Sequence, residues 1–206
     1  MISISPPNQL TLLRILLTPV FVSLLFSQDH TLRQWSFVAF TVASLTDWYD
    51  GWVARKWGYV SRWGKFFDPL ADKVLTSTAF FAFAALGFAP YWMVWIIVVR
   101  DVLITLLRSI AEYKDQPVVT TFVAKVKTFA QMTLIYYLLI LHLARTTPGF
   151  WSGYQSFIDS LLNPTLVYIL MLAITIITLW TGITYIIDNR KTIVDLYVNR
   201  SRVTQS

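Results

Sequence analysis

The stretch DWYDGWVARKWGYVSRWGKFFDPLAD, residues 47–72, carries four acidic side chains: Asp47, Asp50, Asp68 and Asp72. The first pair is three residues apart and the second pair four, so each pair shares one face of a helix. Four carboxylates brought together repel one another and take up protons unless a cation neutralises them. Oxygen ligands on rigid helices suit Mg²⁺, Mn²⁺ or Ca²⁺. The pattern therefore predicts a divalent-metal site, with enough ligands for the two ions that assist phosphoryl displacement.

The residues around this stretch are strongly apolar. Hydrophobic residues make up 56% of the 206 residues and charged residues only 14%, whereas soluble domains carry about 25% charged residues. This shortfall predicts an outer surface that faces lipid, and the length favours one domain over residues 1–206. Residues Met1 to Asn8 lack a basic start and no small-residue cleavage pattern follows them, so we expect no cleaved signal peptide.

Six stretches supply the roughly 20 apolar residues that a membrane-crossing helix needs. They cover about 10–27, 33–54, 68–87, 91–112, 121–145 and 163–188. Gly87 and Pro90 predict a tight hairpin, a loop follows Thr147, and Asn163-Pro164 predicts the start of the last helix. The expected fold is an all-α integral membrane bundle of six transmembrane helices.

The basic residues predict the orientation. An even number of crossings leaves both termini on one side of the membrane. Most basic residues outside the spans lie in the loop after the second span and in the tail: Arg55, Lys56, Arg62, Lys65, Arg190, Lys191, Arg200 and Arg202. Only Arg33 and Arg145 lie near helix ends on the opposite side. The positive-inside rule therefore places both termini in the cytoplasm.

Other charged residues fall within the predicted spans, where each costs about 2.5–3.5 kcal/mol on insertion scales. They are Arg14, Lys73, Arg100, Asp101, Arg108, Lys125 and Lys127. Snorkelling and structural ion pairs are the alternative to a functional role, but snorkelling suits lysine and arginine better than carboxylates. The chain has no cysteine and only two distant histidines, which favours oxygen ligands for a metal. The net charge of +6 is spread among apolar spans, which argues against a nucleic-acid partner.

The full string Asp47-x2-Asp50-Gly51-x2-Ala54-Arg55-x8-Gly64-x3-Asp68-x3-Asp72 resembles the signature of the CDP-alcohol phosphatidyltransferase family at all eight defined positions. The six-span layout is similar as well. The resemblance implies transfer of a phosphatidyl group from CDP-diacylglycerol to an alcohol, with release of CMP. It implies that Asp47, Asp50 and Asp68 hold metal, and that Asp72 completes the second metal site and acts as general base.

The same resemblance implies a binding site for CDP-diacylglycerol. Gly51, Ala54, Arg55 and Gly64 belong to the motif and are expected to line it, with added polar contacts from Asn8 and Thr11. The alternative for Gly51 and Ala54 is close helix packing. The alternative for Asn8 and Thr11 is helix capping.

Further stretches are similar to the family members that use glycerol 3-phosphate and make phosphatidylglycerophosphate. These stretches are residues 7–14, Arg100-Asp101 with Arg108, and Lys125-Val126-Lys127-Thr128-x2-Gln131. The chain departs from them at Ala124, where glycine is usual, and at Leu106. Arg108, Lys125 and Lys127 are the leading candidates to hold the acceptor phosphate, and Arg100 either joins them or pairs with Asp101.

Other functions remain open at this point. The same chemistry on inositol phosphate, serine or another polyol is the nearest rival. Membrane prenyltransferases also use aspartate-rich helices, but they generally need more spans and two separate motifs. An ion-coupled transporter would predict a midplane site and repeated halves. The resemblance further implies a homodimer in a bacterial inner (cell) membrane, surrounded by membrane lipids, with its active site on the cytoplasmic side.

Overall fold

The chain folds into helices throughout the part that the structure describes, and no strand occurs there. The computed structural model describes residues 6–57, 62–113, 122–147, 149, 152–190 and 193. Its helices are α1 (Pro6–Leu25), α2 (His30–Trp57), α3 (Arg62–Ala85), α4 (Tyr91–Tyr113), α5 (Phe122–Thr146), η1 (Ser152–Tyr154), α6 (Gln155–Leu161) and α7 (Pro164–Asp188). Within them, the side chains of residues 6–10, 47–57, 62–69, 112–113, 122 and 152 lie outside the description.

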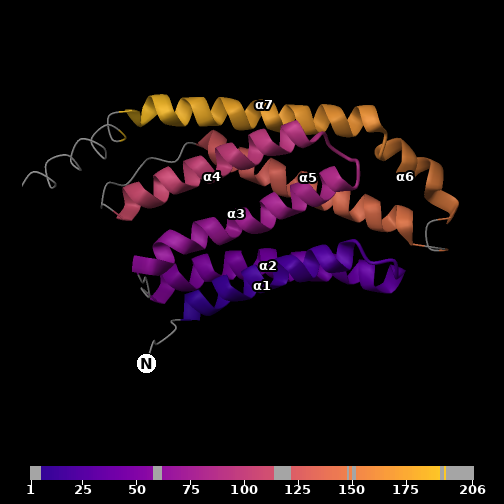
Figure 1. Ribbon diagram of the computed structural model, residues 1–206, viewed down its shortest axis with the longest axis horizontal. Coiled ribbons are helices and arrows are strands. Elements are labelled where there is room, and N and C mark those ends of the chain that lie inside the picture. The colour runs from indigo at the N-terminus through magenta and orange to yellow at the C-terminus, as the bar shows by residue number, and fades with distance from the viewer. Residues whose placement is uncertain are drawn as a thin grey trace, which may run out of the picture.

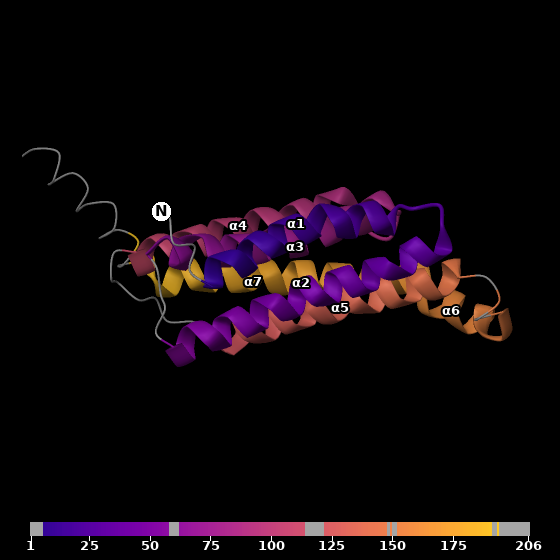
Figure 2. The same cartoon turned by 90° about the horizontal axis from the view of Figure 1, so that it is seen from below.

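The long helices run back and forth along one elongated bundle (Figures 1 and 2). We call the end where α2 finishes and α3 begins the motif end, and the opposite end, which holds the α3–α4 turn and α6, the hairpin end. Helix α1 begins and α7 finishes at the motif end (Figure 1). Each of the six predicted spans corresponds to one long helix, which confirms the helical layout.

The α3–α4 turn forms as the sequence predicts. Gly87 has φ +82°, a left-handed conformation that suits glycine at a helix C-terminus. Its N–H donates to Ala84 O at 3.0 Å, and the N–H of Phe88 donates to Phe83 O at 2.9 Å. The Phe88 and Phe83 rings pack edge to face at 6.2 Å, which supplies the apolar contact typical of this capping motif. The helix therefore ends within one turn and the chain reverses.

The segment before α7 contains more structure than we expected. Asn163 caps α7 by accepting a hydrogen bond from the Thr165 N–H at 2.9 Å, and Pro164 opens the helix, as predicted. However, the predicted loop also contains η1 and α6. Helix α6 is held by its buried Ile158 and by Tyr137, whose hydroxyl donates to Leu161 O at 2.6 Å. A seven-residue helix gives little periodicity from which it could be predicted.

The outer surface of the bundle is apolar, as a lipid environment requires. Large aliphatic and aromatic side chains are exposed along the described helices, with Phe129 at 74%, Trp180 at 66% and Ile176 at 58%. Tyr91, Trp92 and Trp95 are exposed near the hairpin end, and such aromatic side chains are enriched at membrane–water interfaces. Two segments, Val123–Thr146 and Gln155–Asp188, are long and apolar enough to cross a membrane by themselves.

Several threonine hydroxyls on these helices are satisfied locally. Thr18 donates to Arg14 O at 2.8 Å, Thr46 to Val42 O at 2.7 Å and Thr175 to Met171 O at 2.8 Å. Such bonds to the preceding helical turn remove the need for water, which a bilayer interior does not supply. The polar content of these helices is therefore compatible with a membrane.

The core is built from aromatic rings and small residues. The ring of Phe40 on α2 lies 5.2 Å from Phe21 on α1 and 5.3 Å from Tyr136 on α5. Ala39 and Ala43, one turn apart on α2, are buried, and small residues at this spacing allow helices to approach closely. This packing holds α2, and with it half of the aspartate motif, against its neighbours.

Candidate functional site

The aspartate motif lies on α2, which finishes at the motif end, and on α3, which begins there. Asp47 and Asp50 belong to the C-terminal half of α2, and Asp68 and Asp72 to the N-terminal half of α3. Only the Asp72 side chain falls within the described part. It is 26% exposed, and its Oδ2 lies 3.1 Å from Lys73 Nζ. The side chains of the other three aspartates lie outside the described residues, so their convergence on a metal stays a prediction.

No group of three or more acidic, histidine or cysteine side chains that could hold a metal occurs among the described ones. Three of the motif's four carboxylates lie outside the described side chains. The donor set fits a hard divalent cation, because all four groups are carboxylates carried by helices. The helices thus place the four residues at one end of the bundle, and the ion itself is a proposal.

The residues expected to bind the nucleotide also lie on the helix ends near this motif. Gly51, Ala54 and Arg55 occupy the last turns of α2, Gly64 the first turn of α3 and Asn8 the first turn of α1. Their side-chain environment lies outside the description. The exception is Thr11 on α1, whose side chain is buried at 7% exposure. Thr11 therefore lies inside the bundle.

A cavity of about 680 Å³ lies among α3, α4, α5 and α7 toward the motif end. All four residues predicted to hold the acceptor phosphate line it: Arg100 and Arg108 from α4, and Lys125 and Lys127 from α5. Lys73, the neighbour of Asp72, lines it as well. The fold therefore brings five cations to one cavity beside the start of the aspartate-bearing helix α3.

Asp101 also lines this cavity and lies at the centre of a buried polar network. Its side chain is only 4% exposed, and its Oδ1 accepts hydrogen bonds from Lys127 Nζ and from Arg100 Nη1, the latter at 3.0 Å. Gln131 Nε2 donates to the other carboxylate oxygen at 3.2 Å. A buried carboxylate is stable only when it is paired and hydrogen-bonded in this way. The network confirms the expected pairing of Arg100 with Asp101 and joins α4 to α5.

Helix α7 completes the network from the other side. Arg100 Nη2 donates to Thr181 Oγ1 at 2.9 Å, and the arginine side chain passes directly over Gly182. A Cβ atom at Gly182 would lie 3.0 Å from both Cγ and Nε of Arg100. A side chain at this position would therefore require Arg100 to shift from the path by which it reaches Thr181.

The cavity cations divide into two kinds. Lys127 is 2% exposed and is neutralised by Asp101, so its first role is structural. Arg108 and Lys125, by contrast, are exposed and have no ion-pair or hydrogen-bond partner among the residues that the structure describes. These two cations are the ones available to a ligand that enters the cavity.

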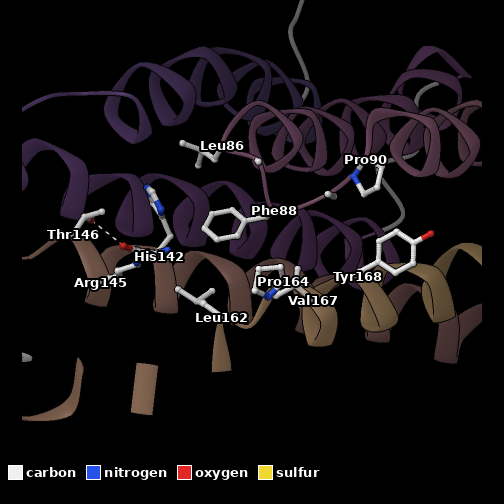
Figure 3. A pocket seen from close by; sticks show the side chains of 12 residues that line it. Leu86, Phe88, Pro90, His142, Arg145, Thr146, Leu162, Pro164, Val167 and Tyr168 are labelled. Carbon is white, nitrogen blue, oxygen red and sulfur yellow. Dashed lines mark hydrogen bonds between the residues drawn. The ribbon is translucent and has the colours of Figure 1, made fainter. Parts of the chain in front are cut away.

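A second cavity, of about 600 Å³, lies at the hairpin end and differs in chemistry (Figure 3). His142, Phe88 and Arg145 contribute to its wall, together with apolar side chains such as Leu162 and Val167. No acidic residue lines it. His142 is buried and packs edge to face on Phe88 at 5.6 Å, as a structural side chain does. The hairpin-end cavity has no feature of a phosphoryl-transfer site.

Three residues of α7 were not identified from the sequence: Tyr185, which lines the motif-end cavity, and Thr181 and Gly182, which contact Arg100 in its wall. They lie in a stretch without a charged residue or a motif that would single them out. Their contribution depends on how α7 packs against α4, which is a property of the tertiary structure.

Comparison with known proteins gives a consistent result. The model of one family, CDP-alcohol phosphatidyltransferase, matches residues 4–187. A relative from Escherichia coli strain K12 is 34% identical over 201 residues, covering 92% of this chain and 97% of its own. A relative from Salmonella typhimurium strain LT2 is 31% identical over 197 residues with the same coverage. One from Bacillus subtilis strain 168 is 36% identical over 146 residues, covering 65% and 76%. All three are named CDP-diacylglycerol–glycerol-3-phosphate 3-phosphatidyltransferase.

Proposed function

Because the chain belongs to the CDP-alcohol phosphatidyltransferase family, we propose that it transfers the phosphatidyl group of CDP-diacylglycerol to glycerol 3-phosphate. The products are phosphatidylglycerophosphate and CMP. Relatives that bear the name of this activity match nearly the whole chain, which supports the acceptor as well as the reaction. The observation that carries the proposal is the cationic cavity beside α3, because a phosphorylated alcohol needs fixed cations and an unphosphorylated one does not.

The aspartate motif is proposed to hold two divalent metal ions, either Mg²⁺ or Mn²⁺. Asp47, Asp50 and Asp68 supply carboxylates, and Asp72 completes the second site. Bound ions of this kind neutralise the diphosphate and stabilise the charge that develops on the departing CMP phosphate. The motif residues Gly51, Ala54, Arg55 and Gly64 line the nucleotide side, with Asn8 and Thr11 from α1.

Asp72 is the proposed general base. Its side chain is partly exposed on α3, and the neighbouring Lys73 also lines the acceptor cavity, so Asp72 lies between motif and cavity. A carboxylate there can take the proton from the attacking hydroxyl of glycerol 3-phosphate. The new phosphorus–oxygen bond forms to that hydroxyl oxygen, and the bond to the CMP oxygen breaks.

Arg108 and Lys125 are proposed to bind the acceptor phosphate directly. Both are exposed cavity residues without a described anionic partner, and arginine can hold two phosphate oxygens at once. Lys127 and Arg100 add positive potential while they keep Asp101 neutralised. The cavity therefore selects a phosphorylated alcohol by charge.

The reaction is proposed to take place at the cytoplasmic face of a bacterial inner (cell) membrane. Arg55 and Lys56 lie in the last turn of α2 and Arg62 and Lys65 in the first turn of α3, at the motif end of the bundle (Figure 1). The basic tail follows α7, which finishes at the same end, and basic residues favour the cytoplasm. In this proposal residues 1–206 form one membrane domain with six crossings, and two copies form a homodimer surrounded by membrane lipids.

The proposal is tested with purified protein, CDP-diacylglycerol, Mg²⁺ and a panel of single acceptors, measuring CMP release and identifying the lipid product. Glycerol 3-phosphate is expected to give CMP and phosphatidylglycerophosphate in equal amounts. Inositol phosphate, serine and free glycerol serve as the comparison acceptors. Turnover with one of them and none with glycerol 3-phosphate would refute the proposed acceptor but keep the chemistry. Ion movement without CMP release would refute the enzyme.

A further inference from the structure

Tyr185 on α7 combines two properties that the motif does not explain. It lines the cationic cavity, opposite the helices that carry Arg108 and Lys125. Its side chain is only 8% exposed, yet its hydroxyl has no hydrogen-bond partner among the described residues. Arg108 and Arg100 line the same cavity as Tyr185.

A buried hydroxyl without a partner destabilises the fold, since it has lost its bonds to water and gained none in return. A phenylalanine would fill the same volume without that penalty. On the same helix, Thr181 both accepts from Arg100 and donates to Ile177 O at 2.9 Å. Other buried hydroxyls among the described residues, such as that of Thr178, also lack a partner, but of these unpartnered hydroxyls only that of Tyr185 belongs to a residue that lines the cationic cavity. An unpartnered hydroxyl that borders a cavity is therefore best explained by a partner that enters the cavity.

We propose that the Tyr185 hydroxyl donates a hydrogen bond to the phosphate of the acceptor and is a specificity-determining residue for phosphorylated alcohols. This inference rests on the proposed function and adds a third donor, from α7, to the cations of α4 and α5. A phosphate between Arg108 and Lys125 presents several acceptor oxygens, and a phenol hydroxyl can donate to one of them. Tyr185 then contributes to the phosphate subsite from α7, a helix that carries none of the motif residues.

The test compares wild type with Tyr185→Phe, which removes one oxygen atom. The KM for glycerol 3-phosphate is expected to rise roughly tenfold or more, as for the loss of a hydrogen bond to a charged group. The KM for CDP-diacylglycerol is expected to stay constant. The thermal midpoint is expected to stay constant or rise, because an unsatisfied hydroxyl has been removed. Inorganic phosphate, used as a competitive inhibitor, is expected to lose affinity by a similar factor.

Tyr137→Phe is the matched control, because its hydroxyl donates to Leu161 O at 2.6 Å and does not line the cationic cavity. This variant is expected to show the opposite pattern, a lower thermal midpoint with an unchanged KM. An unchanged KM in Tyr185→Phe would overturn the inference while leaving the function intact. A raised KM without weaker inhibition by phosphate would indicate that Tyr185 contacts the glycerol part of the acceptor. This result would also overturn the inference. Wild-type protein that fails to use glycerol 3-phosphate would overturn both proposals.

Discussion

At the scale of single residues, the proposed chemistry depends on Asp72, whose neighbour Lys73 lines the cationic cavity. Asp72 is partly exposed and pairs with Lys73, which keeps its charge accessible instead of buried. We predict that Asp72→Asn lowers kcat by roughly 10²–10⁴-fold, the usual contribution of a general base. Measured binding of a CDP-containing ligand is expected to persist. Near-normal kcat in this variant would assign the base to another residue.

Asp101 is predicted to matter for stability more than for chemistry. Asp101→Asn leaves Lys127 and Arg100 without their buried carboxylate, and breaking a buried ion pair costs about 3–5 kcal/mol. The thermal midpoint in detergent is expected to fall clearly.

The control for this variant is Asp159→Asn. Asp159 Oδ1 lies 3.3 Å from Arg145 Nε in an ion pair whose two side chains are each 55% exposed. Exposed pairs contribute about 0–1 kcal/mol, so its midpoint is expected to change little. An equal fall in thermal midpoint in the two variants would show that the Asp101 network stabilises the fold no more than an exposed ion pair does.

At the scale of elements, α7 positions the acceptor site although it carries none of the motif. Arg100 crosses Gly182 to reach Thr181, so the contact between α4 and α7 fixes the orientation of an arginine in the cavity wall. We predict that Gly182→Ala displaces Arg100 and lowers kcat/KM for glycerol 3-phosphate several-fold, measured by CMP release.

Stability alone would not reveal this effect. Alanine favours a helix over glycine by up to about 1 kcal/mol, which opposes the strain of the close contact. Gly153→Ala is the control, because a Cβ atom there meets nothing within 4 Å. Equal activity of the two alanine variants would mean that Arg100 adjusts without consequence.

The sequence predicts the helices of this fold better than it predicts their side-chain partners. Gly87 and Asn163-Pro164 mark helix ends through local backbone chemistry, and both predictions are confirmed. Helix α6 was missed because seven residues give too short a pattern. The pairing of Asp101 with Lys127 joins residues 26 positions apart on two helices. Tyr185 lines the same cavity from a third helix, α7. Such contacts depend on which helices are neighbours, which periodicity does not determine.

At the scale of the whole molecule, the proposed function places the motif end at the cytoplasmic face of the membrane. The chain has no cysteine, so single cysteines can be introduced as reporters without background. We predict that Asp29→Cys, near the hairpin end, reacts with a membrane-impermeant thiol reagent in intact cells. Asp188→Cys, at the C-terminal end of α7, is expected to react only after the membrane is opened. Both positions are exposed, so accessibility reports the side of the membrane. The reverse pattern would place the motif on the outer face.

Phosphatidyl transfer is proposed to depend on cations that the aspartates of α2 and α3 hold. The most direct measurement is CMP release from CDP-diacylglycerol and glycerol 3-phosphate as a function of Mg²⁺ concentration, for wild type and for Asp50→Asn. Chelation is expected to abolish wild-type turnover, and added Mg²⁺ to restore it. Asp50→Asn is expected to need far more Mg²⁺ or to stay inactive. Full turnover in the presence of chelator, or an identical Mg²⁺ requirement in both proteins, would contradict the claim.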